Sequence, residues 1–182
     1  MLAMVFLVVG SVLPLATLGA AEPDPIAAPP ALKTFDLLDQ FGTNHHVAFP
    51  RSRPLLLLVG DRQGVKEVDT WIEPLKSRWA TNTDILGIAD VRAVPRFLRN
   101  RVTTGIRGGR PQPVMLDFEG IVIEALGCER RVANLFVTHP DGRVVATVTG
   151  PPTESNLKRV HAALTPLLLP PTPAREAVGP VR

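Results

Sequence analysis

Cysteine offers the most direct chemistry in this sequence, because a thiolate is both a nucleophile and a metal ligand. The 182-residue chain holds one cysteine, Cys128. A single cysteine forms no disulfide within its own chain, so two interpretations stay open. The first is a buried thiol that packs as a small hydrophobic side chain. The second is an exposed, reactive thiol whose pKa is lowered by the neighbouring cations Arg130 and Arg131.

The histidines do not indicate a metal site. His45 and His46 are adjacent, and in an extended segment adjacent side chains point to opposite sides, so the two cannot chelate one ion together. His139 and His161 lie far from them in the sequence. We therefore expect solvated histidines, no metal and no other cofactor.

A polar turn at residues 61–64 has the sequence pattern most typical of a binding site. It follows an apolar run and leads into a helical pattern, and ligands of parallel sheets bind where a strand ends and a helix begins. An ordinary structural turn is the alternative interpretation. The candidate surface residues in this region are Asp61, Arg62, Gln63 and Lys66.

Two arginine-containing segments are weaker candidates. A stretch rich in glycine and arginine lacks the G-x-G-x-x-G spacing of a phosphate loop, so we expect residues 103–113 to be a mobile connector. A short helix is expected over residues 94–102, and Arg92, Arg96 and Arg99, just before and within it, fall on one helical face at i, i+4 and i+7. A solvated face is the ordinary interpretation there, and contact with an acidic partner is the alternative.

Apolar patterns predict the elements that position these residues. Continuous apolar runs predict buried strands at residues 54–60, 84–90 and 113–116. Helical spacing of apolar side chains predicts an amphipathic helix from Val65 to Trp79. Pro74 removes a backbone hydrogen bond inside that helix, so we expect a kink before it.

The two ends of the domain are marked by further patterns. Residues 35–42 fit a short strand or an extended segment before the core. The turn Pro140-Asp141-Gly142 predicts a hairpin between strands at residues 132–138 and 143–149. A helix over residues 153–164 then closes the domain.

The termini differ in composition from the centre. Residues 1–21 predict a secretory signal peptide, with an uncleaved anchor to the inner membrane formed by residues 2–21 as the alternative. A proline-rich linker is expected at residues 22–33, one domain at 34–164 and a disordered, proline-rich tail at 165–182. The net charge of +3 includes no run of five or more like charges, so no nucleic-acid binding is expected.

The order of these elements resembles the thioredoxin-like superfamily, in particular exported redoxins of the cytochrome-maturation and thiol-peroxidase type. The resemblance covers nearly all of residues 34–164 and implies a three-layer α/β fold. Its central mixed sheet has a parallel β-α-β start and a C-terminal β-hairpin plus helix. The segments that carry it are Phe35-x-Leu37-x-Asp39-Gln40-x-Gly42, residues 54–59, the helix with Pro74, residues 113–117 and residues 136–145.

The residues on which redoxin chemistry depends are missing. Such redoxins carry a reactive cysteine at the start of the first long helix and a second cysteine three residues later. Counting back from Pro74 places these positions at Lys66 and Asp69. The peroxiredoxin pattern, a cysteine preceded by a threonine and a proline, is also missing. Ala133 stands where the superfamily has a cis-proline that meets the substrate chain, and since a non-proline cis bond costs about 3 kcal/mol, we expect a trans bond.

The resemblance and the missing cysteines lead to a functional hypothesis. We expect an exported, periplasmic or extracellular domain without catalysis, which binds other envelope proteins through residues 61–66, Ala133 or the arginine face. The alternative is a single-cysteine, peroxidase-like enzyme acting through Cys128 with an external reductant. Binding of a small anion at the helix start is a third hypothesis.

Overall fold

The computed structural model describes residues 30–168. The expected signal peptide or anchor at residues 1–21 lies outside the described residues, as does the tail beyond residue 168. Between residues 30 and 168, no helix combines the length and the apolar character needed to cross a membrane.

The elements alternate along the chain much as the apolar patterns predict. They are β1 (Phe35–Leu38), β2 (Asn44–Val47), β3 (Leu55–Gly60), α1 (Val65–Trp79), β4 (Asp84–Asp90), a 3₁₀ turn (Arg96–Leu98), α2 (Arg99–Gly109), β5 (Met115–Asp117), α3 (Ile121–Leu126), β6 (Asn134–Thr138), β7 (Val144–Thr149) and α4 (Glu154–Leu168). Helix α1 continues through Pro74, and α4 extends beyond the expected limit at Leu164.

The central sheet has five strands in the order β5-β4-β3-β6-β7. Strands β3, β4 and β5 are parallel, whereas β6 is antiparallel to β3 and β7 is antiparallel to β6. The run of leucines in β3 places it at the centre, because a strand buried on both faces requires apolar side chains at every position. The predicted fold class, a mixed sheet with a parallel start and a C-terminal hairpin plus helix, is confirmed.

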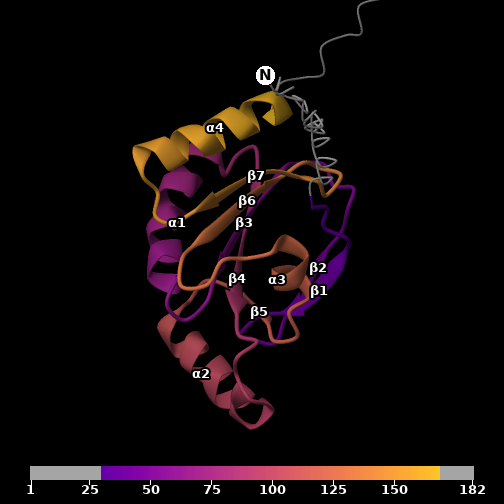
Figure 1. Cartoon of the computed structure of the whole chain (residues 1–182). Coiled ribbons are helices and arrows are strands. Elements are labelled where there is room, and N and C mark those ends of the chain that lie inside the picture. The colour runs from indigo at the N-terminus through magenta and orange to yellow at the C-terminus, as the bar shows by residue number, and fades with distance from the viewer. Residues whose placement is uncertain (1–29, 169–182) are drawn as a thin grey trace, which may run out of the picture.

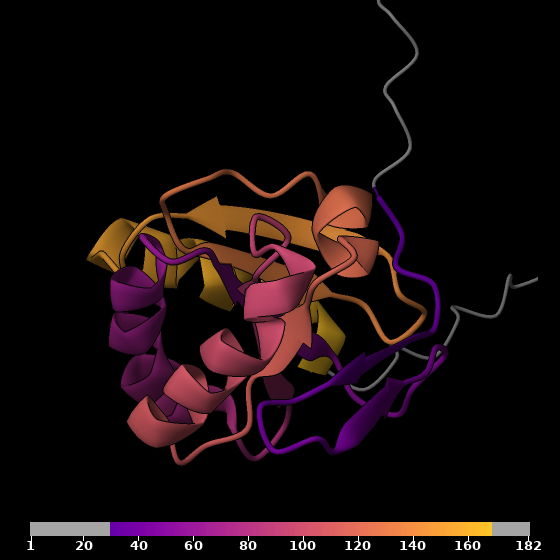
Figure 2. The ribbon, with the colours of Figure 1, turned by 90° about the horizontal axis from the view of Figure 1, so that it is seen from below.

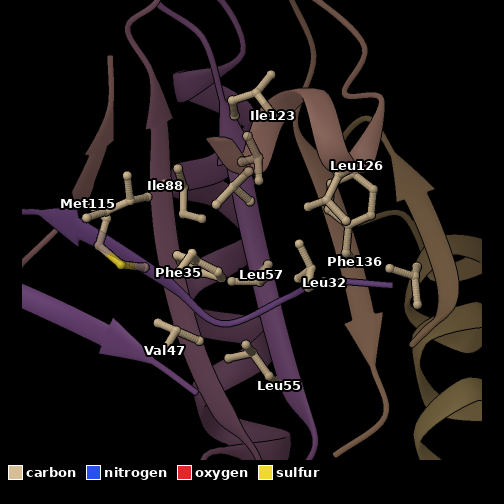
Figure 3. Close-up of a cluster of buried hydrophobic side chains, with 14 residues drawn as sticks. Leu32, Phe35, Val47, Leu55, Leu57, Ile88, Met115, Ile123, Leu126 and Phe136 are labelled. Carbon is tan, nitrogen blue, oxygen red and sulfur yellow. The ribbon is translucent and has the colours of Figure 1, made fainter. Parts of the chain in front are cut away.

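Alternation along β3 divides the interior into two cores. Leu56 and Leu58 point to the face covered by α1 and α4, where Trp71 is fully buried (Figure 1). The indole N–H of Trp71 donates a hydrogen bond to the carbonyl of Gly150 at 2.8 Å. Leu55 and Leu57 point to the opposite face, where α3 and the β1-β2 hairpin cover them (Figure 3). The domain therefore has three layers: α1 with α4, the five-stranded sheet, and α3 with the β1-β2 hairpin.

The N-terminal segment belongs to the second core. Strands β1 and β2 pair with each other in a separate antiparallel sheet, and Asp39 forms a bridge to Met115 of β5. Leu32, which the sequence places in the linker, is buried, and its N–H donates to the carbonyl of Gly142. The chain before β1 is therefore packed against the β6-β7 hairpin.

Helix α2 corrects the sequence-based expectation for this region. A short helix was expected at residues 94–102 and a mobile connector at 103–113, but α2 occupies Arg99–Gly109. Its glycines disfavour a helix, and none of its residues is buried, so its sequence carries no strong helical pattern. Figures 1 and 2 show it at one end of the fold, beside α1. Contacts with the rest of the domain therefore decide its position.

Gln40 provides the main anchor for the chain that follows α2. Its side chain is fully buried, and its Nε2 donates to the carbonyls of Arg110 and Gln112 at 3.1 and 2.8 Å. Its Oε1 accepts the N–H of Val114 at 2.8 Å. Arg107 of α2 donates to the Gln40 carbonyl at 2.8 Å. The side chain and the backbone carbonyl of Gln40 together fix α2 and the start of β5 relative to the N-terminal hairpin.

Replacing Gln40 with alanine should lower the free energy of unfolding by about 2 kcal/mol or more, because three backbone groups lose a buried partner. Urea unfolding of the purified chain measures this change. Gln63→Ala is the matched control, since Gln63 is exposed, and it should change stability by less than about 0.5 kcal/mol. Equal effects of the two substitutions would contradict the anchoring role of Gln40.

Candidate functional site at the start of α1

Strand pairing brings two distant loops together at the start of α1. Val59 of β3 lies opposite Asn134 of β6 in the antiparallel register. The turn at residues 61–64, which follows β3, therefore meets the loop at residues 129–133, which precedes β6. The five candidate residues from the sequence lie in or beside these two segments, together with Glu67, Arg130 and Arg131.

Asp61 closes the turn that leads into α1. Its Oδ1 accepts the N–H groups of Gln63 and Gly64 at 2.9 and 2.8 Å, and its Oδ2 accepts the N–H of Arg131 at 2.9 Å. Burial raises the pKa of Asp61, but the hydrogen bonds from Gly64, Arg131 and Gln63 and the charge of Arg130 outweigh it, so the pKa lies below its ordinary value. The carboxylate thus occupies the backbone donors that a small anion would use.

Gly64 permits the close approach of the two loops. A Cβ atom placed on Gly64 would lie 2.6 Å from the carbonyl carbon of Val132 and closer still to its oxygen. Gly64 is fully packed at this contact, and α1 begins at the next residue. A residue with any side chain would separate the start of α1 from the loop before β6.

Glu67 completes the contact from the first turn of α1. Its Oε2 accepts the N–H of Ala133 at 2.9 Å, across 66 positions in the sequence. Ala133 is fully buried, so its side chain contributes no exposed surface. The peptide bond before Ala133 is trans, as expected, since Phe49–Pro50 is the cis bond found within residues 30–168. Asn134 holds the same loop through bonds to Glu129 and Val132.

The two positions expected for redox cysteines lie on α1. Lys66 is exposed in the first turn. Asp69 lies one turn further along, where its Oδ2 accepts a hydrogen bond from Arg110 at 2.6 Å. This ion pair links α1 to the end of α2, so the second position serves to connect two helices.

Four exposed cations surround the start of α1. Arg62 and Lys66 come from the turn and the helix, and Arg130 and Arg131 come from the loop before β6. None of the four forms an ion pair with a carboxylate of residues 30–168. Arg62 and Lys66 were candidates from the sequence, whereas Arg130 and Arg131 were considered only as neighbours of the Cys128 thiol. Their sequence position immediately before β6 is the signal that could have placed them beside residues 61–64.

Cys128 lies in a different environment, after α3. It is partly buried and packs against the core that contains α3. Burial, together with the charges of Asp90 and Asp117, raises the pKa of its thiol to about 12, although Arg92 acts in the opposite direction. Arg130 and Arg131 are not among the groups that shift its pKa. These causes favour the first interpretation, a buried thiol, over the alternative of a thiol activated by Arg130 and Arg131.

The remaining arginine and histidine candidates are engaged elsewhere. Arg92 precedes the 3₁₀ turn and pairs with Asp90 at 3.0 Å, whereas Arg99 begins α2 and pairs with Glu119. The expected common helical face is therefore wrong. His45 and His46 contact Asp39 and Asp36 respectively, at 2.8 and 3.0 Å. Residues 30–168 contain no group of three or more histidine, cysteine or acidic side chains suited to a metal ion.

Comparison with solved structures identifies the architecture. The pneumococcal exposed lipoprotein thioredoxin Etrx1 from Streptococcus pneumoniae superposes with a TM-score of 0.56 at 13% identity, covering 74% of this chain and 99% of that one. A thiol:disulfide interchange protein of Chlorobium tepidum gives a TM-score of 0.53 at 19% identity, covering 77% and 99%. The chain has a thioredoxin-like fold. Peroxidoxin BcpB from Mycobacterium tuberculosis shares this fold, with a TM-score of 0.52 at 18% identity and coverage of 74% and 96%.

Sequence comparison adds no family to this thioredoxin-like domain: no protein-family model matches the chain, and no curated protein matches it in sequence. In this domain α1 begins beside the loop before β6. With one cysteine, however, it has no C-x-x-C pair. The contact at this point is made by carboxylates and backbone N–H groups.

Gly64→Ala should destabilise the thioredoxin-like domain by about 3 kcal/mol, because the new methyl group overlaps the backbone of Val132. Gly105→Ala is the matched control. A Cβ at Gly105 meets no atom within 4 Å, so alanine should stabilise α2 by about 0.5–1 kcal/mol. Thermal unfolding distinguishes the two variants. A Gly64→Ala domain as stable as the original would disprove the close contact.

Asp61→Asn should lower the free energy of unfolding by about 1–2 kcal/mol at pH 7, because charge-assisted hydrogen bonds become weaker. The pKa of Asp61 is lower when folded, so its stabilisation is present above its ordinary pKa of 3.8 and disappears as pH falls through the folded pKa. The difference between the two proteins in urea unfolding should therefore shrink below pH 4. A difference that stays constant between pH 7 and pH 3 would contradict this role.

Proposed function

We propose that this thioredoxin-like domain is a non-catalytic binding module of the cell envelope, which contacts an acidic segment of another protein. The binding surface is the basic end of α1, defined here as Arg62, Lys66, Arg130 and Arg131. The observation that carries the proposal is the exposure of these four cations with no carboxylate partner within residues 30–168. Acidic groups of a partner would supply the missing counter-charges and steer the encounter.

The rigidity of the basic end supports a role in recognition. Asp61 and Glu67 fix the two loops relative to each other through the backbone of Arg131 and Ala133. Four flexible side chains therefore project from a backbone that is already ordered before binding. Pre-organisation of this kind reduces the entropy lost on association.

The environment of Cys128 favours binding over thiol chemistry. Nucleophilic cysteines need a lowered pKa, and burial raises the pKa of Cys128 to about 12. Cys128 also follows α3, whereas the basic end lies at the start of α1. A thiol enzyme acting through Cys128 is therefore not supported by the charges around this residue.

The proposed location rests on the sequence and on similar folds. The apolar segment at residues 1–21 has the pattern of a secretory signal. A thioredoxin described as an exposed lipoprotein has the same fold. We accordingly propose a periplasmic or extracellular domain.

Site-specific photo-crosslinking in the cells that produce the protein tests the binding surface. A photoreactive residue at Gln63, which is exposed between Arg62 and Lys66, should yield an adduct with an envelope protein. The adduct should disappear when Arg62→Glu and Arg130→Glu are introduced together, because the partner is acidic. Its crosslinked peptide, read by mass spectrometry, should contain several acidic residues.

Arg53→Glu with Arg78→Glu is the matched control for charge. Both arginines are exposed, and they precede β3 and end α1, away from the basic end. This pair should leave the adduct unchanged. Loss of the adduct in both double variants would show that net charge alone, and not this surface, determines binding. An adduct that survives the charge reversal of Arg62 and Arg130 would refute the proposed surface.

Thiol titration tests the alternative enzyme. At pH 8 the Cys128 thiol in the folded chain should react with a disulfide reagent about a thousandfold more slowly than in denaturant, because its pKa is about 12 and each pKa unit changes the thiolate fraction tenfold. Cys128→Ser provides the blank. Rapid reaction of the folded chain, with an apparent pKa below 8, would restore the single-cysteine enzyme as the leading function.

A further inference from the structure

An apolar cleft lies beside α1, between α2 and strands β4 and β5. Its volume is about 420 Å³, within the range of pockets that bind small molecules. Val68 and Ile72 of α1 form one wall, and Ile106 of α2 faces them. The cleft follows α1 from Val65 to Lys76, a length of about 16 Å at the rise of an α-helix.

The cleft exists because α2 does not cover the sheet. Strand β4 lies between two neighbours in the sheet, yet most of its residues are only half-buried. None of the residues of α2 is buried. Figures 1 and 2 show α2 at the end of the fold, beside α1.

Gly87 forms part of the cleft's floor. Leu86 and Ile88 pack into the core on the opposite face of the sheet, so alternation along β4 directs position 87 toward the cleft. A Cβ atom on Gly87 would meet one atom within 4 Å, a methyl group of Val114 at 3.9 Å. The absence of a side chain at this position leaves the space open.

The charged groups of the cleft are positive. Lys76 and Arg110 line it, together with His45 and Gln112, and no carboxylate of residues 30–168 does so. Arg110 is already paired with Asp69. Lys76 forms no ion pair with a carboxylate of the described residues, and it stands at one end of the cleft. A ligand with one negative group would neutralise the charge of Lys76.

We propose that the cleft binds a monoanionic amphiphile with a single alkyl chain, of the fatty-acid type. The chain lies along α1 over Gly87, where it covers the half-buried side of β4. The carboxylate lies at Lys76, which donates to it. The elongated apolar floor favours a single alkyl chain, and the unpaired Lys76 at its end favours a negatively charged head group over a neutral or positive one. This site is separate from the basic end of α1, with which it shares no cation.

Three probes with the same chain and different head groups test the proposal. Dodecanoate, dodecanol and dodecyltrimethylammonium are titrated separately into the full chain by calorimetry, the two ions below their micelle concentrations and the alcohol below its solubility limit. Dodecanoate should bind about tenfold or more tightly than dodecanol, because a charge-assisted hydrogen bond to Lys76 is made only by the anion. Dodecyltrimethylammonium should bind more weakly than dodecanol. No binding of dodecanoate, or equal affinity for all three, overturns the proposal.

Matched variants locate the ligand. Gly87→Leu should abolish dodecanoate binding by filling the floor of the cleft. Lys76→Gln should remove the preference for the anion, whereas Arg78→Gln on the same helix should keep it, because Arg78 is exposed and does not line the cleft. Thermal unfolding checks that each variant is folded. If Gly87→Leu is unstable, Ala89→Leu takes its place, because Ala89 also lines the cleft. Unchanged binding in the filled variant overturns the proposal.

Discussion

The antiparallel pairing of β3 with β6 is the interaction on which the proposed sites depend. It brings the end of β3 and the beginning of β6 to one edge of the sheet, with Val59 opposite Asn134. The turn before α1 and the loop before β6 must then share the same space. The missing side chain of Gly64 makes that possible, and the position of α1 over the sheet follows from it. Both the basic end and the apolar cleft are built on this helix.

Ala133 and Glu67 are physically coupled through a single hydrogen bond. A proline at position 133 would have no N–H group, but alanine introduces one in a fully buried place. A buried N–H without an acceptor is costly, and the carboxylate of Glu67 supplies that acceptor. The same carboxylate fixes the first turn of α1 to the loop.

Sequence patterns were sufficient where burial alone determines structure. The leucine run of β3, the helical spacing of α1 and the turn at Asp141 each carry a local pattern that tertiary contacts only reinforce. Helix α2 was missed because its glycines oppose a helix and its anchors, Gln40 and Asp69, lie far away in the sequence. Local propensity is overridden there by distant contacts.

Sequence reasoning could place the candidate residues near the start of α1, but not the contacts among them. Asp61, Arg62 and Lys66 follow from the rule that parallel strands end at ligand sites, and the missing cysteines follow from the resemblance. The contacts of Arg131 with Asp61 and of Ala133 with Glu67 span 70 and 66 positions in the sequence, so they leave no local pattern. The apolar cleft also escapes sequence reasoning, because it depends on how far α2 stands from β4 and on the empty space at Gly87.

The two tryptophans give the domain a built-in optical reporter. The chain has no tyrosine, and both tryptophans lie on α1, so its intrinsic fluorescence comes almost entirely from one helix. Trp71 is buried with its indole bonded to Gly150, whereas Trp79 stacks against His161 of α4 at 6.4 Å. Emission from Trp71 thus reports the docking of α1 on the sheet, and quenching of Trp79 by the imidazole reports the docking of α4. The docking of both helices can therefore be followed by fluorescence without an added dye.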